Sequence, residues 1–382
     1  MPSAPAPDHP FGTLTNLSCA SVGTKVLFAT DDFFSPAETF LSPAPPVFDP
    51  STFTPFGKEM DGWETRRKRT LGHDWCLIKL GLPGSIVGFE IDTAFFTGNQ
   101  TPGISVQAAE LGEDLRLTRV GATGSACSPA ELEAAEKVGS ERWEEVVPYT
   151  KLGPGYEEER YHFVTVDAAA VGKRFTHLRV NYWPDGGVAR FRTFGLVSKD
   201  WKSVKPDQIV DLAHVENGGR AVSFSNAHYG HPRNLIAPGR SLTMAGGWET
   251  ARNPDRPKTY VCDPVTGQLI IPGKHWAILE LGHCGTVTSI EIDTHLFKGN
   301  FPESAIVEGA VITDAALAET NSDAVLWNTL VPRTKLGPHA QVNFDVSSTS
   351  PVTHIRVTMF PDGGISRVRV LGRISSSGVN VA

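Results

Sequence analysis

The sequence contains few cysteines, and these show no pairing pattern. Its 382 residues include five cysteines, an odd number, and no two of them are separated by only two residues as in many zinc sites. The sequence therefore indicates neither a complete disulfide framework nor a zinc motif, and we expect a reducing compartment. The cysteines are Cys19, Cys76, Cys127, Cys262 and Cys284.

Long apolar runs and targeting signals are also missing. No stretch approaches the roughly 18 apolar residues of a membrane span. The first 15 residues contain no basic segment followed by an apolar one, so no secretory signal is indicated. The ending NVA differs from the SKL-type peroxisomal signal. We expect a cytoplasmic protein that does not bind membranes.

Charge and motif content exclude further classes of protein. The net charge of −7 is mild and no long block of lysine or arginine occurs, so nucleic acid is not an expected partner. The patterns GxSxG, HExxH, GxxxxGK[ST] and GxGxxG before a helix are absent. Serine hydrolases, zinc proteases, kinases and dehydrogenases of the usual types are therefore not indicated.

Four stretches of sequence occur twice, in the same order along the chain. In the longest pair, each copy contains EIDT followed by a loop that ends in Gly-Asn. The two copies of each stretch lie too many residues apart to be neighbouring units of a solenoid, so each copy is expected to be a domain. The pairs are 60–69 with 244–253, 73–99 with 274–300, 147–154 with 331–338, and 176–195 with 353–372.

The duplication predicts the domain boundaries. We expect a first domain over residues 20–198, a connector over 199–213 and a second domain over 214–374. Glycine and proline are abundant, with 37 and 28 residues, which favours short strands joined by turns.

Apolar residues alternate with polar or small ones inside each copy. Val87, Phe89 and Ile91 are predicted to point inward, as are Ile290 and Ile292 in the second copy. Strands with one apolar face, bounded by Gly/Pro turns, predict antiparallel β-sandwiches. The fold class is therefore all-β, with two tandem sandwich domains produced by internal duplication.

Two further segments carry structural predictions. In the stretch HLRVNYW, Leu178, Val180 and Tyr182 share one face, whereas Arg179 and Asn181 lie on the opposite, polar face. Residues 128–143 predict a helix that begins with a Ser cap and has a glutamate three residues later. This helix has no close sequence counterpart in the second copy, so we interpret it as a loop insertion.

The repeated phrase GWET places a tryptophan and a glutamate beside arginines. A planar guanidinium can grip a carboxylate through two parallel hydrogen bonds, so the phrase could bind a small anion. Alternatively, the tryptophan fills a core and the charged residues form a surface ion pair worth under about 1 kcal/mol. The residues are Trp63, Glu64, Arg66 and Arg67 in the first copy, and Trp248, Glu249 and Arg252 in the second.

The loop after each EIDT strand supplies a second set of polar groups. The aspartate at the strand end either caps the loop or, with the following asparagine, contacts a polar ligand. The second copy adds a histidine and a lysine, and histidine can transfer protons near neutral pH. The residues are Asp92 and Asn99 in the first copy, and Asp293, His295, Lys298 and Asn300 in the second.

Together these phrases resemble the allantoicase family. The resemblance covers residues from about 20 to 374 and includes DDFFSPAE, DGWETRRKR, HDWCLIKLG, DTAFFTGN and PDGGVARFRTFG with their second-copy counterparts. It implies two jelly-roll, galactose-binding-like domains. It also implies hydrolysis of allantoate to (S)-ureidoglycolate and urea, a step of purine and allantoin degradation that makes nitrogen available.

The chemistry implied by this resemblance needs a carboxylate clamp, a general acid and a general base. The clamp would be Arg66 and Arg67, or Arg252. The acid and base would come from Glu64, His73 and Asp92, or from Glu249, Asp293 and His295. Further substrate contacts would be made by Trp63, Asn99, Trp248, Lys298 and Asn300.

The copies are not identical, since Gly246 replaces Asp61 and Ala251 replaces Arg66. Two arrangements are therefore open: one active copy beside a supporting copy, or a site that is completed across an interface.

We expect no cofactor, and a divalent ion such as manganese is the exception to be tested. We also expect a homo-oligomer. The competing hypothesis is a non-catalytic, galactose-binding-like module for a small molecule or carbohydrate.

Overall fold

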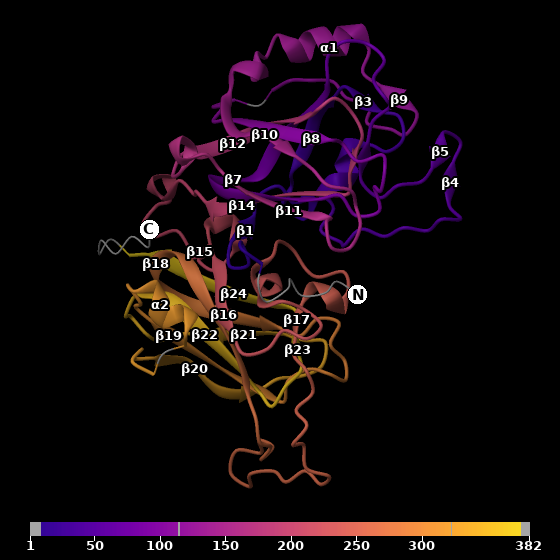
Figure 1. The fold of residues 1–382 in the computed structure, drawn as a ribbon. Helices are drawn as coiled ribbons and strands as arrows, with labels where there is room; N and C mark the ends of the chain where they lie inside the picture. Colours follow the sequence, from indigo (N-terminus) through magenta and orange to yellow (C-terminus); the bar gives the residue numbers. More distant parts are fainter. Residues whose placement is uncertain (1–8, 114, 322, 376–382) are drawn as a thin grey trace. The chain divides into compact units, whose positions relative to one another are not determined.

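The computed structural model describes residues 9–113, 115–321 and 323–375. The chain divides into two compact units, which we describe separately (Figure 1). The first repeat unit is Leu14–Ser198, and the second is Lys199–Ala382 together with the segment before residue 14. Both consist mainly of antiparallel strands, so the prediction of an all-β fold with duplicated domains is confirmed. In the parts of the chain that the structure describes, no helix has both the length and the apolarity to cross a membrane.

The first repeat unit is organised around one long strand, β7 (Asp74–Asp92). The N-terminal half of β7 pairs with β2 and β12, and its C-terminal half pairs with β11 and β14. β7 therefore links two sets of strands, and β8 and β10 extend the first set. The partners are β1 (Thr15–Asn16), β2 (Lys25–Ala29), β8 (Gly103–Ala109), β10 (Glu144–Lys151), β11 (Tyr161–Thr165), β12 (Arg174–Tyr182) and β14 (Arg190–Val197).

The second repeat unit follows the same plan around β18 (His275–Asp293). One of its strands, β15, lies inside the segment 199–213 that the sequence predicts as a connector, and it pairs with β24. The partners are β15 (Val210–Asp211), β16 (Arg220–Phe224), β19 (Ser304–Ala310), β20 (Asn328–Lys335), β21 (Gln341–Asp345), β22 (Val352–Phe360) and β24 (Arg367–Ile374).

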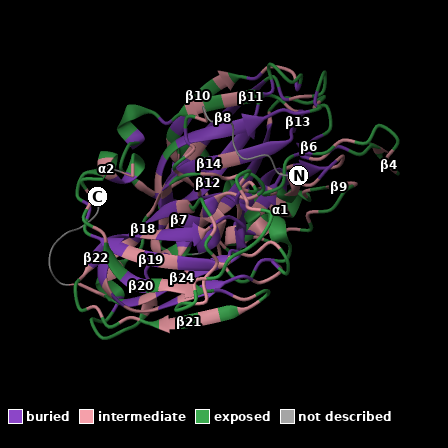
Figure 2. Ribbon diagram, turned by 90° about the horizontal axis from the view of Figure 1, so that it is seen from below, coloured by how far each residue is buried: buried purple, intermediate pink, exposed green. Residues whose placement is uncertain are grey.

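The inward-facing residues of the long strands form the cores. Phe89, Ile91, Ile290 and Ile292 are all buried, as the alternation predicts, and the strands of both units appear largely purple in Figure 2. The prediction for Val87 is wrong, because its side chain is 38% exposed. Phe194 pairs with Gly88 and the next residue pairs with Ile86, so Val87 is the extra residue of a β-bulge. A bulge interrupts the two-residue period, and Ile86 points inward instead.

The polar face predicted for β12 is also buried. Arg179 and Asn181 keep only 6% and 1% of their surface exposed. The segment containing α1 (Pro129–Glu136) covers this face, where Ser140 accepts a hydrogen bond from Arg179. The helix begins at the predicted Ser128 cap. A shorter helix, α2 (Ala315–Glu319), precedes β20 as α1 precedes β10, so the helix is not an insertion unique to the first copy.

Both ends of β7 lie beside the same connection. Tyr182, the last residue of β12, pairs with Asp74, and Arg190, the first residue of β14, pairs with Asp92. The short segment 183–189 therefore spans the two ends of β7. Gly187 within it must be glycine, because an added Cβ would lie 2.0 Å from the Phe96 ring. We refer to residues 61–73, 93–101 and 183–189 as the first loop end, and to 246–253, 294–302 and 360–366 as the second loop end.

Candidate functional site

The repeated tryptophans are completely buried in the two loop ends. β6 (Trp63–Glu64) pairs with β13 (Gly187–Val188), and β17 (Trp248–Glu249) pairs with β23 (Gly364–Ile365). Trp63 and Trp248 have no exposed surface. Their indole N–H groups donate to the backbone oxygens of Asp31 at 2.9 Å and Asn226 at 2.8 Å. This burial favours the alternative in which the two tryptophans fill the cores.

The two arginines of the first copy differ in their surroundings. Arg66 donates from Nε to Asp31 at 2.8 Å and lies over the Phe33 ring. Arg67 is exposed, and no partner for its side chain is found within residues 9–113, 115–321 and 323–375. Asp31 also accepts a hydrogen bond from the Arg66 backbone N–H, and Asn226 makes the same contact to the Ala251 N–H in the second copy. Of the three arginines predicted as clamps, Arg67 and its counterpart Arg252, which is also exposed, have no side-chain partner among the described residues.

The aspartates at the strand ends are held in ion pairs. Asp92 is 1% exposed and accepts two hydrogen bonds from Arg160, at 2.9 and 2.7 Å, as well as the Ala94 backbone N–H. Asp293 is completely buried and accepts from Arg240 and from the His295 backbone N–H. Each carboxylate is therefore held by an arginine and by the backbone N–H of the loop that follows it, which supports the capping alternative.

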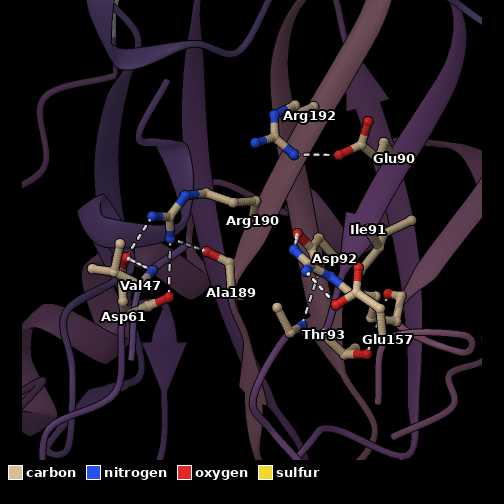
Figure 3. Close-up of polar contacts among 12 residues, drawn as sticks. Val47, Asp61, Glu90, Ile91, Asp92, Thr93, Glu157, Ala189, Arg190 and Arg192 are labelled. Carbon is tan, nitrogen blue, oxygen red and sulfur yellow. Dashed lines mark hydrogen bonds and ion pairs between the residues drawn. The ribbon is translucent and has the colours of Figure 1, made fainter. Parts of the chain in front are cut away.

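Figure 3 shows Asp92 in this setting, together with a neighbouring ion pair in which the Arg190 guanidinium points toward Asp61. The Asp61 carboxylate also accepts the Val47 N–H. In the second copy glycine replaces Asp61, and the hydrogen bonds that the equivalent Arg367 makes within the described residues all go to backbone oxygens. Burial lowers the pKa of Arg367 to about 10, and the positive charge of Arg369 acts in the same direction.

Glu64 is a buried carboxylate of the first loop end, and no cationic side chain pairs with it among the described residues. It is 8% exposed, and its Oε1 accepts a hydrogen bond from Asn99 Nδ2 at 2.7 Å. Burial raises the pKa of Glu64 to about 7, and the bond from Asn99 offsets only part of this effect. Glu249 and Asn300 form the same pair at 2.6 Å, but Glu249 is less buried. Of the predicted residues, the structure therefore brings Glu64 together with Asn99 and Glu249 with Asn300.

The histidines occupy different parts of the two loop ends. His73 Nε2 lies 3.0 Å from Asn181 Oδ1, and its ring stacks on Trp183 with centroids 3.8 Å apart. Burial lowers the pKa of His73. His295 instead lies beside His339, with ring centroids 4.6 Å apart, and Lys298 is exposed.

Backbone contacts show how Glu64 and His73 are related. The Thr65 N–H donates to Gly186, and the N–H of Asp74, the residue after His73, donates to Pro184. The chain from Glu64 to His73 therefore begins and ends against the single turn 184–187. No direct contact joins the two side chains among the described residues, and an intervening substrate would have to connect them.

Three residues of this site were not singled out from the sequence. Asp31 orients Arg66, while Asn181 and Trp183 hold His73. Asn181 lies in the repeated block HLRVNYW, but the second copy has Thr358 there, so the repeat itself gives no signal for it. Among the described residues, no group of three or more histidine, cysteine, aspartate or glutamate side chains is arranged to hold a metal ion.

Comparison with known proteins gives one consistent family. The model of the allantoicase repeat matches residues 15–198 and 210–375. A probable allantoicase from Pseudomonas savastanoi pv. phaseolicola is 40% identical over 368 residues, 96% of this chain and 98% of the relative. One from Pseudomonas fluorescens (strain SBW25) is 39% identical with the same coverage. The crystal structure of allantoicase from Saccharomyces cerevisiae is 32% identical, with a TM-score of 0.68, covering 94% of this chain and 92% of that one.

Proposed function

The chain belongs to the allantoicase family, and we propose that it hydrolyses allantoate to ureidoglycolate and urea at the first loop end. The observation that carries this location is Glu64, a buried carboxyl whose pKa is about 7 and which has no cationic partner among the described residues. A group with that pKa exchanges its proton near neutral pH, as a general acid requires. The reaction belongs to purine and allantoin degradation.

Glu64 serves as the general acid. Allantoate carries its carboxylate on a carbon that also bears two ureido groups. Cleavage of one central C–N bond expels urea, which leaves readily only when its nitrogen receives a proton. Protonated Glu64 supplies that proton, and a water molecule adds its hydroxyl to the carbon and loses a proton to a base. The sum is allantoate plus water giving ureidoglycolate plus urea.

Arg67 serves as the carboxylate clamp. It is exposed, it lies three residues beyond Glu64, and its side chain has no partner within the described part of the chain. Arg66, although adjacent, is already committed to Asp31. A free guanidinium can form two parallel hydrogen bonds with a carboxylate, which would fix the substrate relative to Glu64. Asn99 holds Glu64 in place, and the remaining hydrogen-bonding groups of its side-chain amide can contact a ureido group.

The second loop end supports a weaker version of this site. Glu249, Asn300 and Arg252 are present, but the glutamate is less buried and lysine replaces His73. We therefore assign catalysis to the first copy. The second copy's role is to complete the fold.

Urea release tests the function. The purified protein should release urea from allantoate but not from allantoin, because the closed ring of allantoin has no free carboxylate for Arg67. Activity on allantoin with allantoate inert would contradict the assignment.

Three expectations from the sequence remain proposals. These are a cytoplasmic location, a homo-oligomeric state and activity without an essential metal ion. Light scattering on the purified protein would determine the oligomeric state. Chelator treatment followed by addition of manganese would test the metal: lost and restored activity would contradict a metal-independent reaction.

A further inference from the structure

We propose that Asn181 holds His73 in the tautomer with its proton on Nε2, so that Nδ1 is the atom that accepts the proton of the attacking water. Asn181 is then a positioning residue and His73 the general base opposite Glu64. This rests on the proposed function in that the substrate is allantoate, whereas the tautomer itself does not depend on it.

The orientation of the Asn181 amide is determined by its neighbours. Its Oδ1 accepts from Arg179 Nε at 2.8 Å, and an arginine has only donors to offer. Its Nδ2 faces the Ser105 backbone oxygen at 3.3 Å, which can only accept. The reversed amide would place donor against donor and acceptor against acceptor. Asn181 is 1% exposed, so water does not relieve such a mismatch.

The orientation of Asn181 determines the proton on His73. Asn181 Oδ1 is an acceptor, and His73 Nε2 lies 3.0 Å from it, so Nε2 must carry the hydrogen. In the neutral imidazole, Nδ1 then keeps its lone pair. No partner for His73 Nδ1 is found among the described residues, which leaves this nitrogen available to water.

The imidazole plane is also held. His73 stacks on Trp183, and the indole N–H of Trp183 donates to Ser105 Oγ at 2.9 Å. Ser105 is thus a common anchor, since its hydroxyl also faces Asn181 Nδ2 at 3.2 Å. The arrangement fixes both which nitrogen is protonated and which way the ring lies.

The charges around His73 favour its neutral form. Burial has the largest effect and lowers its pKa, and the positive charges of Arg179 and Lys68 act in the same direction. The hydrogen bond to Asn181 and the negative charge of Asp74 oppose them. Neutral His73 and protonated Glu64 can therefore coexist near pH 7, which is the state that one base and one acid require.

The second copy lacks this arrangement. Lysine stands at the position of His73, and Thr358 at that of Asn181. The strand pairing places Ile306 opposite Thr358, where Ser105 is opposite Asn181. The exchange Asn181→Thr therefore introduces the second copy's own residue into the first, and Thr358→Asn is its matched control.

The test is a two-bond ¹H–¹⁵N correlation spectrum of the full chain labelled with ¹⁵N-histidine, recorded at an alkaline pH where histidine is neutral. The chain has 12 histidines, so the spectrum of His73→Gln identifies the His73 signals by their loss. In the wild type we expect a protonated Nε2 and a bare Nδ1. Asn181→Thr should move the ¹⁵N chemical shifts of His73 Nδ1 and Nε2 toward each other, because the two tautomers then mix. Thr358→Asn should leave both chemical shifts unchanged.

Several results would overturn the proposal. A wild-type spectrum with the proton on Nδ1 would do so without any variant, even if Asn181→Thr fails to fold. Unchanged His73 shifts in folded Asn181→Thr would remove the role of Asn181. In urea-release assays, His73→Gln should lose about 10²- to 10⁴-fold in kcat/KM, and full activity would remove the base. A wild type inactive on allantoate would instead defeat the proposed function, and the spectrum would still decide the tautomer.

Discussion

The two repeat units share the same arrangement of buried groups at their loop ends and differ in the ionisable residues around them. Both bury a tryptophan whose N–H donates to a backbone oxygen, and both pair a glutamate with an asparagine. The first has Asp31 with Arg66, where the second has Asn226 with Ala251. The tryptophan of the repeated phrase thus fills the core in both copies, and the copies differ in the polar groups around it.

The largest expected difference between the copies concerns the paired glutamates. Glu64→Gln removes the proton donor and should lower kcat/KM for allantoate by about 10²- to 10⁴-fold. Glu249→Gln should have little effect, because the second copy has lysine in place of His73 and threonine in place of Asn181. Steady-state urea release by the two variants measures this directly, and equal losses would mean that both copies contribute to catalysis.

The next largest difference concerns the buried aspartates. Asp92→Ala leaves Arg160 buried without its main partner, which should cost about 3–5 kcal/mol of stability. Asp293→Ala should cost less, because the Arg240 side chain is 42% exposed and keeps Glu291 as a partner. Chemical denaturation of the two variants compares these costs. An Asp92→Ala protein of normal stability but without activity would restore Asp92 as a catalytic candidate.

A third difference is a dependence of stability on pH. The pKa of Glu64 rises from 4.5 to about 7 on folding, so the folded state holds this proton more tightly than the unfolded state. The stability linked to Glu64 is complete below pH 4.5 and is lost as the pH rises through about 7. Glutamine does not ionise and therefore has no such loss. Above pH 7 the free energy of unfolding of Glu64→Gln should exceed that of the wild type by up to about 3 kcal/mol.

Unfolding by denaturant at pH 4.5 and pH 8 would measure this gain. Glu249→Gln, the same exchange in the second copy, is the control. A Glu64→Gln effect that is the same at both pH values would show that the Glu64 carboxyl does not gain a proton on folding.

The smallest expected difference concerns the clamp. Arg67→Ala should lose a charge-assisted bidentate contact worth about 1.5–3 kcal/mol, roughly 10- to 150-fold in kcat/KM, with little change in Tm. Arg67→Lys should recover only part, because an ammonium cannot reproduce the fork. Arg252→Ala should cost distinctly less. If Arg66→Ala rather than Arg67→Ala caused the larger loss, the clamp would be assigned to the wrong arginine.

The sequence predicts the frame of this molecule better than its site. The alternation of apolar and polar residues in β7 and the Ser128 cap of α1 depend on residues that are neighbours in the sequence. The sequence therefore predicts both, apart from the bulge at Val87. The ion pair of Asp92 with Arg160 joins residues 68 positions apart, and Arg160 lies outside the repeated blocks. The sequence predicts that Asn181 lies on the polar face of its strand, and only the folded chain shows that the α1 segment covers this face.

The central claim is that the titrating acid of the reaction is Glu64 of the first copy. The pH dependence of kcat/KM in the wild type, Glu64→Gln and Glu249→Gln tests it most directly, because this profile reports the ionisations of the free enzyme. Activity of the wild type and of Glu249→Gln should fall as the pH rises through an apparent pKa near 7, the value of Glu64. The residual activity of Glu64→Gln should lack this fall. A fall that persists in Glu64→Gln and disappears in Glu249→Gln would contradict the account.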